Sequence, residues 1–307
     1  MSGPKPHLVV NPTSACGRTG RQLDRIARAV RAELGEFDCS LTCAPGDGVR
    51  LAREAVSAGS RLVVAVGGDG TASEVVEGLA SCAERDVLFG FIPSGTGGDL
   101  RRTLGYSLDP AEAARVLAHG RETVCDLGRV EFVGRDGTPR SRHFVNVSGC
   151  GISGRAVQEV ERLGKAVGGR IAYLLGAAKA LVGWRDQPVR WRVDGGAWHD
   201  EAITCLSVCN GRFFGGGMMV APDARMDDGL FDVTVWKGFG FKDLVQKRPM
   251  LYDGRHVHLP NTERCRARTV EVEQAGSAPV LLELDGEQPG TLPARFTIVP
   301  GALRLRV

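Results

Sequence analysis

A glycine-rich segment, Gly67-Gly-Asp-Gly-Thr71, contains the residues of this chain best suited to chemistry. It follows the short apolar run Val63–Val66, which is typical of a buried strand in a parallel sheet. A helical pattern comes next, and Thr71 with Glu74 has the spacing of a capping box. Backbone N–H groups at such a turn favour a phosphate, and the carboxylate of Asp69 suits the Mg²⁺ that accompanies ATP. The alternative is a tight turn in which Asp69 has no chemical role.

Two further loops of similar character follow predicted strands. The first is Asn11-Pro-Thr-Ser14 and the second is Pro93-Ser-Gly-Thr-Gly-Gly-Asp99. The carboxyl ends of parallel strands meet at one edge of a sheet, where ligands bind in α/β folds. We therefore expect all three loops at one edge. Taken alone, Asp227-Asp228 before Gly229 and the segment Asp285–Glu287 are each typical of a turn.

Strand and helix patterns alternate through the first part of the chain, which predicts a doubly wound α/β domain. The predicted strands cover residues 8–10, 39–42, 61–66 and 87–92. The predicted helices cover residues 23–34, 49–58 and 110–118, besides the one after Thr71 and a short one that starts at Thr96-x-x-Asp99 and ends at Leu104.

Strands dominate from about Cys125 onward, which predicts an antiparallel β-sandwich domain. We expect strands at 130–133, 143–147, 189–193, 198–202, 203–209, 231–236, 256–259, 269–273 and 280–284, with a helical insert at 156–182. Trp191 and Trp198 are expected to face each other across a hairpin. Residues 294–307 are expected to form a hairpin that returns to the first domain. The predicted domains are residues 1–122 with 296–307, and residues 123–295.

Composition restricts the class of protein. The net charge of +3 in 307 residues is too small to indicate nucleic-acid binding. The nine Cys do not have the spacing of zinc ligands, and we expect free thiols in a reducing, cytoplasmic compartment. The apolar stretch Ile171–Trp184 is too short to span a bilayer, so we expect a soluble protein, at most transiently at the membrane surface. The oligomeric state is left open, a homodimer included.

The motifs, in their order along the chain, resemble those of the diacylglycerol kinase catalytic-domain family, which includes bacterial lipid kinases, sphingosine kinases and ceramide kinases. The resemblance covers essentially the whole chain. Besides the three loops, it rests on Cys209-Asn-Gly-Arg212, Gly215-Gly-Gly217, Ala221-Pro-Asp-Ala224, Asp227-Asp-Gly-Leu-Phe-Asp232 and Asp285-Gly-Glu287. It implies an α/β nucleotide domain and a β-sandwich domain, with ATP in the cleft between them.

The resemblance also implies roles for individual residues. The nucleotide would be bound by Asn11, Pro12, Thr13, Ser14, Ala15, Thr42, Gly67, Gly68, Asp69, Gly70, Thr71, Ala72, Ser73, Gly95 and Thr96. Mg²⁺ would be held by Asp69 and Asp99, in part through water. A structural Mg²⁺ would lie at Asp228 with main-chain oxygens of Arg225 and Leu230. Asp285 is expected to be the catalytic base and Glu287 its partner, with the reverse assignment as the alternative.

The chain departs from the family pattern at three places: Ala15-Cys16 precedes Gly17, Gly98 and Leu100 replace Asn and Phe, and Ser73 replaces Asn. The retained carboxylates nevertheless predict an active enzyme. We expect an ATP- and Mg²⁺-dependent kinase acting on diacylglycerol or a related lipid alcohol. The alternatives are an NAD kinase-like enzyme, which would share the Gly-Gly-Asp-Gly-Thr segment, a kinase of a non-lipid hydroxyl, and a non-catalytic sensing module.

Overall fold

The structure is a computed structural model that describes residues 4–83, 86–94, 98–163, 175–176 and 178–307. The chain divides into two compact units, Met1–Cys125 with Gly301–Val307, and Asp126–Pro300. Two strands, β5 (Glu122–Gly134) and β15 (Gly290–Arg306), contribute residues to both units.

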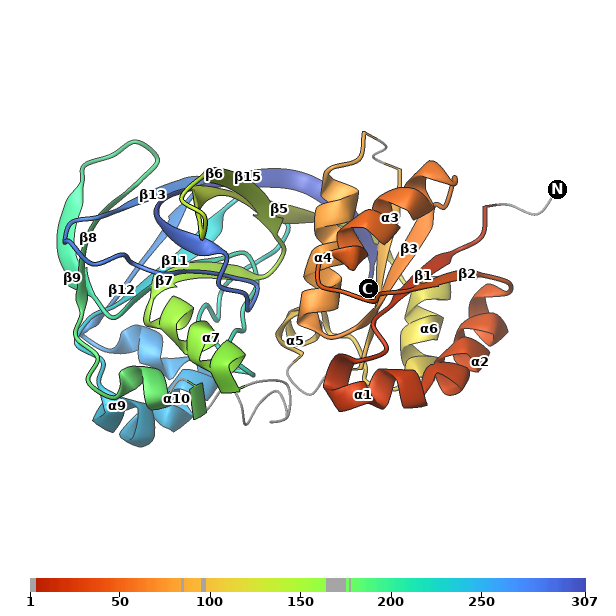
Figure 1. Ribbon diagram of the computed structural model, residues 1–307, viewed down its shortest axis with the longest axis horizontal. Coiled ribbons are helices and arrows are strands. Elements are labelled where there is room, and N and C mark those ends of the chain that lie inside the picture. Colours follow the sequence, from red (N-terminus) through yellow and green to blue (C-terminus); the bar gives the residue numbers. More distant parts are fainter. Residues whose placement is uncertain (1–3, 84–85, 95–97, 164–174, 177) are drawn as a thin grey trace. The chain divides into compact units, whose positions relative to one another are not determined.

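The sheet of the first unit is parallel (Figure 1). Its strands run in the order β2 (Asp38–Leu41), β1 (His7–Val10), β3 (Leu62–Gly67) and β4 (Leu88–Pro93), and the end of β15 pairs with β4. All six residues of β3 are buried. A strand covered on both faces must be apolar throughout, which explains why the segment Leu62–Val66 shows no alternation.

In the part of this unit that the structure describes, six helices pack around the sheet. They are α1 (Ser14–Arg21), α2 (Leu23–Leu34), α3 (Asp47–Ser57), α4 (Asp69–Ala80), α5 (Asp99–Leu104) and α6 (Pro110–His119). Helix α3 packs on α4, and α2 packs on α6. The first contact is close because α4 presents Gly78, where a Cβ atom would lie only 2.7 Å from the Ala52 Cβ. The predicted helices are thus present, and α5 ends at the predicted Leu104.

The predicted capping box at the start of α4 is wrong. The helix begins at Asp69 with Gly68 as its N-cap residue, and no side chain caps it. The Glu74 carboxylate instead accepts hydrogen bonds from the N–H groups of Gly46 (2.9 Å) and Gly48 (2.8 Å) at the start of α3. Helix α3 has no side-chain cap of its own, so Glu74 satisfies donors of a neighbouring helix.

The second unit contains two antiparallel sheets. One has the order β15, β13 (Thr269–Gln274), β8 (Gln187–Val193), β9 (His199–Ile203), with β5 pairing β15 and β6 (Pro139–Phe144). The other has the order β12 (Thr262–Ala267), β11 (Phe231–Trp236), β10 (Cys205–Cys209), β7 (Val147–Gly151), β14 (Leu282–Leu284). Together with the α/β unit, these sheets confirm the predicted fold class.

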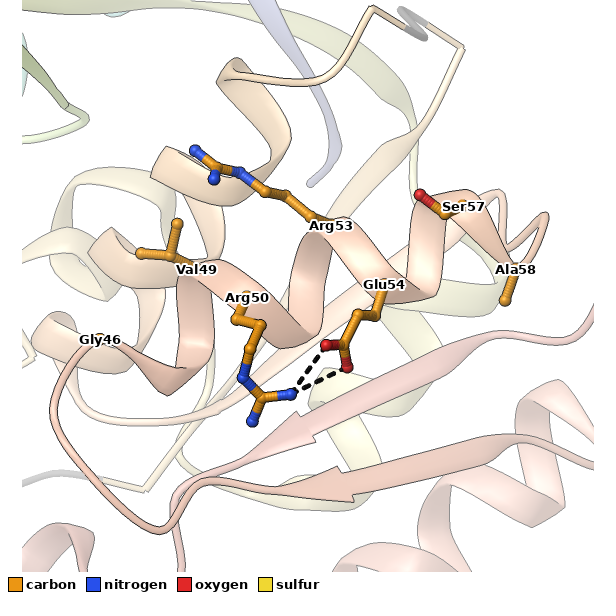
Figure 2. Close-up of a pocket in the computed structure, with 7 residues that line it drawn as sticks. All are labelled: Gly46, Val49, Arg50, Arg53, Glu54, Ser57 and Ala58. Atoms are coloured by element: carbon orange, nitrogen blue, oxygen red, sulfur yellow. Dashed lines mark hydrogen bonds and ion pairs between the residues drawn. The ribbon is translucent and has the colours of Figure 1, made fainter.

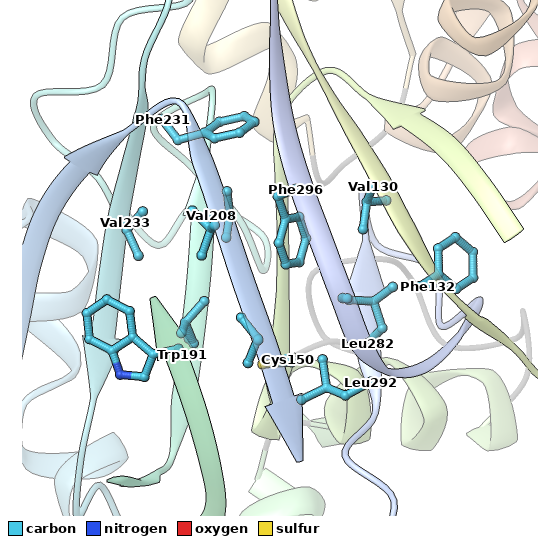
Figure 3. Close-up of a cluster of buried hydrophobic side chains, with 14 of the residues drawn as sticks. Val130, Phe132, Cys150, Trp191, Val208, Phe231, Val233, Leu282, Leu292 and Phe296 are labelled. Atoms are coloured by element: carbon cyan, nitrogen blue, oxygen red, sulfur yellow. The ribbon is translucent and has the colours of Figure 1, made fainter. Parts of the chain in front are cut away.

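The main core of the second unit contains residues from both sheets (Figure 3). Along β10, Leu206 and Val208 enter this core, whereas Cys205 and Cys209 enter a second apolar cluster. Successive side chains of a strand point to opposite faces, so a strand with two buried faces is apolar at both. All nine cysteines lie in the described residues and none forms a disulfide; Cys205 and Cys209 are fully buried, as expected for thiols packed as small apolar side chains.

The helices of this unit include α7 (Ile152–Leu163), α9 (Phe241–Gln246) and α10 (Arg248–Asp253). The strand predicted at 256–259 is wrong, because residues Arg255–His258 form a 3₁₀ helix that starts after Gly254 at φ +80°. His256 is therefore completely buried, with its ring edge-on to Trp236 at 5.3 Å, and does not lie at the surface. Part of the predicted helical insert, residues 164–174 and 177, lies outside the described residues.

Two further predictions are corrected by strand register. Trp191 pairs with His199 and stacks on its ring at 4.6 Å, so it does not face Trp198. Trp198 instead lies beneath the guanidinium groups of Arg190 and Arg192, at 4.8 and 4.5 Å. The end of the chain is not a hairpin, since β15 is one strand that pairs antiparallel with β13 and then parallel with β4.

No helix among the described residues is both long enough and apolar enough to cross a membrane.

One glycine of the second unit, Gly128, packs directly against an aromatic ring of the core. A Cβ atom at Gly128 would lie 2.1 Å from the Phe144 ring, which itself contacts Phe231 and Phe296. We expect Gly128→Ala to lower the free energy of unfolding by about 1–3 kcal/mol through overpacking, measured by urea unfolding.

Gly70→Ala is the matched control for this substitution. Nothing lies within 4 Å of a Cβ atom at Gly70, which is inside α4. The control should raise stability by about 0.5–1 kcal/mol, since alanine favours a helix. Equal effects of the two substitutions would contradict the packing argument.

Candidate functional site

The three loops of the first unit that begin after β1, β3 and β4 lie together, as the sequence predicts. The N–H of Asn11 donates to the Val66 oxygen (3.0 Å), and the N–H of Ser94 donates to the Gly67 oxygen (2.8 Å). The Ser14 hydroxyl lies 3.3 Å from that of Ser94. The loops that follow β1, β3 and β4 are thus connected by hydrogen bonds at the carboxyl edge of the sheet, where parallel sheets bind their ligands.

The first loop has an uncommon backbone. The Asn11 side chain accepts hydrogen bonds from the N–H (3.1 Å) and hydroxyl (2.9 Å) of Thr13, which sets the turn. Ala15, Cys16 and Gly17 then take positive φ values of 51°, 55° and 77°. Left-handed conformations are rare outside glycine, and successive N–H groups in such turns form anion-binding concavities. At Ala15 and Cys16, where the chain departs from the family pattern, the backbone is left-handed although neither residue is glycine.

Asp69 connects the second loop to the third. Its carboxylate accepts hydrogen bonds from the backbone N–H groups of Asp99 (2.9 Å) and Leu100 (3.3 Å). Burial raises the pKa of the Asp69 carboxyl above its ordinary value, while these N–H groups and the nearby Arg102 and Arg101 lower it in part. These N–H groups hold the carboxylate in place, but they do not fully compensate its negative charge. Such a carboxylate suits a cation that is bound to a phosphate group.

The second predicted Mg²⁺ ligand, Asp99, and the other predicted nucleotide residues take different places. Asp99 is buried and forms an ion pair with Arg102 at 3.1 Å. Thr42 and Ser73 are buried as well, and the N–H of Thr42 donates to the Val10 oxygen (2.9 Å) at the end of β1. Gly95 and Thr96 lie outside the described residues.

The Thr71 side chain packs over Gly67, where a Cβ atom would lie 2.5 Å from its hydroxyl oxygen. Glycine at position 67 therefore leaves the space that the turn needs for this threonine.

A surface pocket of this unit lies along α3 (Figure 2). Its lining consists of Gly46, Val49, Arg50, Arg53, Glu54, Ser57 and Ala58. The Arg50 guanidinium binds the Glu54 carboxylate at 2.8 and 3.0 Å, so the two charges that face each other here are already paired. None of the predicted nucleotide residues lines this pocket.

In the second unit, Asp285 lies at a tight turn. Asp285 (φ 44°) and Gly286 (φ 88°) both have positive φ, as in a two-residue hairpin turn. The Asp285 carboxylate accepts hydrogen bonds from the N–H groups of Val145 (2.9 Å), Asn146 (3.0 Å) and Val147 (3.1 Å). The Asp285 carboxylate is therefore fixed in orientation, and it also fixes the backbone that leads into β7.

Glu287 has a different environment two residues later. Its carboxylate forms an ion pair with Arg142 at 2.7 Å, and 41% of its side chain is exposed. The same turn therefore presents two carboxylates with different partners, one bound by backbone N–H groups and one paired with an arginine.

The Asp228 turn has its own cation. The Asp228 carboxylate accepts a hydrogen bond from the N–H of Leu230 (3.1 Å) and pairs with the Arg266 guanidinium. Arg225 pairs with Asp227 at 3.2 Å. The structural Mg²⁺ expected here stays a prediction, and this chain itself supplies Arg266 as the positive charge at Asp228. Within the described ranges, no cluster of three or more His, Cys, Asp or Glu side chains is arranged to hold a metal ion.

Sequence reasoning missed two buried polar residues of this region. The Asp126 carboxylate accepts a hydrogen bond from the N–H of Gly229 (2.7 Å). The Asn210 side-chain amide donates to the main-chain oxygens of Asp126 (2.8 Å) and Val145 (2.7 Å). They connect the Asp228 turn to the segment that Asp285 holds. A carboxylate between the apolar residues Cys125 and Leu127 was the signal for Asp126.

Comparisons with known proteins agree with this arrangement. The family profile described as "Diacylglycerol kinase catalytic domain" matches residues 5–130, and that described as "YegS C-terminal NAD kinase beta sandwich-like domain" matches residues 146–307. The chain is 32% identical to a protein of Stenotrophomonas maltophilia described as "Probable lipid kinase YegS-like", over 100% of this chain and 97% of that one. It is 31% identical to a diacylglycerol kinase of Mycobacterium tuberculosis, over 84% and 81%.

Solved structures show the same fold. A diacylglycerol kinase from Bacillus anthracis superposes with a TM-score of 0.72 at 23% identity, covering 100% of this chain and 97% of that one. The yeast NADH kinase has a TM-score of 0.53 at 10% identity, covering 100% and 84%. The chain therefore belongs to the diacylglycerol kinase and YegS-like lipid kinase family, as its motifs indicated.

The buried position of Asp69 predicts a pH effect on stability. Because burial raises its pKa above the ordinary 3.8, the folded protein binds a proton at Asp69 more readily than the unfolded chain. Stability from this group is therefore lost as the pH rises above that value. As the pH is raised from about 4 to 7, we expect the free energy of unfolding of the wild type to fall relative to that of Asp69→Asn, in urea titrations.

Asp24→Asn, at an exposed position of α2, controls for the loss of one surface carboxylate. Parallel pH curves for the wild type and Asp69→Asn would show that burial does not perturb Asp69.

Proposed function

We propose that this chain is an ATP- and Mg²⁺-dependent kinase that phosphorylates a hydroxyl group of diacylglycerol or of a related lipid alcohol. The observation that carries the proposal is the bonding of Asp69 to the N–H groups of Asp99 and Leu100 at the edge where the three loops after β1, β3 and β4 meet. Membership of a lipid kinase family supports the reaction class, and the relatives named as diacylglycerol kinases support the acceptor.

The residues of the first unit bind and orient the nucleotide in this proposal. Phosphoryl transfer needs mainly positioning and neutralisation of charge, and backbone N–H groups of glycine-rich turns supply both to phosphates. Asp69 and Asp99 would hold Mg²⁺, which neutralises charge on the phosphate groups. Their carboxylates are prearranged for this by the α5 backbone and by Arg102.

The acceptor hydroxyl needs a group that orients it and takes its proton late in the transfer. We assign this role to Asp285, with Glu287 as its partner. The three N–H groups that bind Asp285 fix its carboxylate in one orientation, as a positioned base requires. Glu287, whose side chain is 41% exposed, is the base in the reverse assignment.

A lipid acceptor is also consistent with an apolar pocket of about 60 Å³ in the second unit. Phe214, Met218, Trp236, Phe239 and Leu251 are among its lining residues. Ligand pockets usually measure about 300–1,000 Å³, so this one suits a segment of an acyl chain. Phe214 is at the same time a member of the second apolar cluster. The acceptor would be taken from a bilayer surface during transient attachment of the protein.

The function is tested by incubating the purified protein with labelled ATP, Mg²⁺ and four acceptors in parallel: diacylglycerol in anionic vesicles, a sphingoid base, NAD and a soluble alcohol. We expect label in the lipid fraction, with diacylglycerol preferred. Transfer to NAD alone would identify an NAD kinase-like enzyme, transfer to the soluble alcohol alone a kinase of non-lipid hydroxyls, and nucleotide binding without transfer a sensing module. Any of these three outcomes overturns the proposal.

Substitutions at the hairpin turn separate the two carboxylates. We expect Asp285→Asn to lower turnover by about 10²–10⁴-fold with ATP affinity nearly unchanged. It should also lower the thermal midpoint, because an amide cannot accept all three backbone hydrogen bonds. Glu287→Gln should leave the midpoint almost unchanged and alter the Mg²⁺ dependence of the rate.

Glu131→Gln is the control for these variants, since Glu131 is an exposed residue paired with Arg129 in the same unit. Loss of ATP affinity with full turnover in Asp285→Asn would place Asp285 in nucleotide binding and not in proton transfer.

A further inference from the structure

Two adjacent arginines of α5 face the carboxylates described above, and they differ in their partners. Arg102 forms an ion pair with Asp99 at 3.1 Å. The Arg101 side chain forms no ion pair and no hydrogen bond with any described residue, and its Nε atom is buried without a partner. Arg101 nevertheless interacts electrostatically with both Asp69 and Asp99. One guanidinium at this edge is therefore available to a further anion.

The place of Arg101 depends on Gly98. This residue has φ +61°, and a Cβ atom there would lie 2.7 Å from the Arg101 Nε and 3.0 Å from its Cδ and Cγ. The Arg101 stem therefore passes directly over Gly98. Any side chain at position 98 would meet this stem, so glycine here makes the space in which Arg101 lies.

The charge around Arg101 is unfavourable in the absence of a ligand. The Arg101 Nε atom is buried, and the neighbouring charge of Arg102 repels the Arg101 guanidinium, against the attraction of Asp69 and Asp99. A partly desolvated guanidinium that lacks a hydrogen-bonded anion is costly, and an incoming phosphate would remove that cost. The planar guanidinium also matches phosphate oxygens in pairs, which an ammonium group does not.

We propose that Arg101 binds a phosphate group of the nucleotide, and that Gly98 holds Arg101 in position by leaving space for its stem. This inference rests on the proposed function, because it takes the edge around Asp69 as the nucleotide site. It assigns to Arg101 direct contact with phosphate, and to Gly98 an effect only through Arg101.

Nucleotide binding without turnover tests the inference. Calorimetry measures the binding of ATP and of adenosine in the presence of Mg²⁺. The proteins compared are the wild type, Arg101→Gln and Arg101→Lys. We expect ATP to bind Arg101→Gln about ten- to a hundredfold more weakly, as for the loss of a charge-assisted hydrogen bond, with adenosine affinity unchanged. Arg101→Lys should be intermediate, since it keeps the charge and loses the fork. Arg28→Gln, at an exposed position of α2, controls for net charge.

A double-mutant cycle tests the role of Gly98. Gly98→Ala should weaken ATP binding and add little to the effect of Arg101→Gln, because both remove the same contact. Additive losses would overturn the assigned role of Gly98. Unchanged ATP affinity in Arg101→Gln, or an equal loss for adenosine, would overturn the role of Arg101, and thermal midpoints identify variants that fail to fold. Absence of ATP binding by the wild type would instead contradict the proposed function.

Discussion

The candidate site of the first unit depends on one polar contact. The Asp69 carboxylate accepts hydrogen bonds from the N–H groups of Asp99 and Leu100. Asp69 starts α4 and Asp99 starts α5, so a single side chain fixes the start of one helix against the start of another. Burial makes this contact costly, as the raised pKa of Asp69 shows. Sites that bind ligands commonly keep such unfavourable groups where function needs them, at some expense of stability.

The second unit uses a carboxylate in a similar way. Asp285 accepts three backbone N–H groups at the start of β7, and Asp126 accepts the N–H of Gly229 in another turn. In both units, hydrogen bonds from backbone N–H groups to carboxylate side chains connect the loops to each other. These loops extend from sheets that pack on apolar cores. Loops held in this manner keep a defined geometry, which positioning of phosphates and of an acceptor hydroxyl requires.

Local patterns predicted the elements well where local physics dominates. The buried β3 follows from an unbroken apolar run, and the alternation of faces along β10 follows from the two-residue period of a strand. The errors have a common cause in contacts between distant residues. Glu74 caps α3 and not α4, and His256 is buried in a 3₁₀ helix against Trp236. The partner in each case is 20 or more residues away, so spacing along the chain carries no record of it.

By itself, the sequence determined the fold class, the family and the segments that form the candidate site, because glycine turns and apolar runs specify local backbone conformation. Tertiary structure alone decided which charged groups are paired. Asp69 and Arg101 are 32 positions apart in the sequence. Their spacing does not show that Asp69 is buried against the start of α5, or that the Arg101 side chain passes over Gly98. Burial and hydrogen-bond partners depend on the whole packed unit, and they set the charge and the position of every group that could bind phosphate.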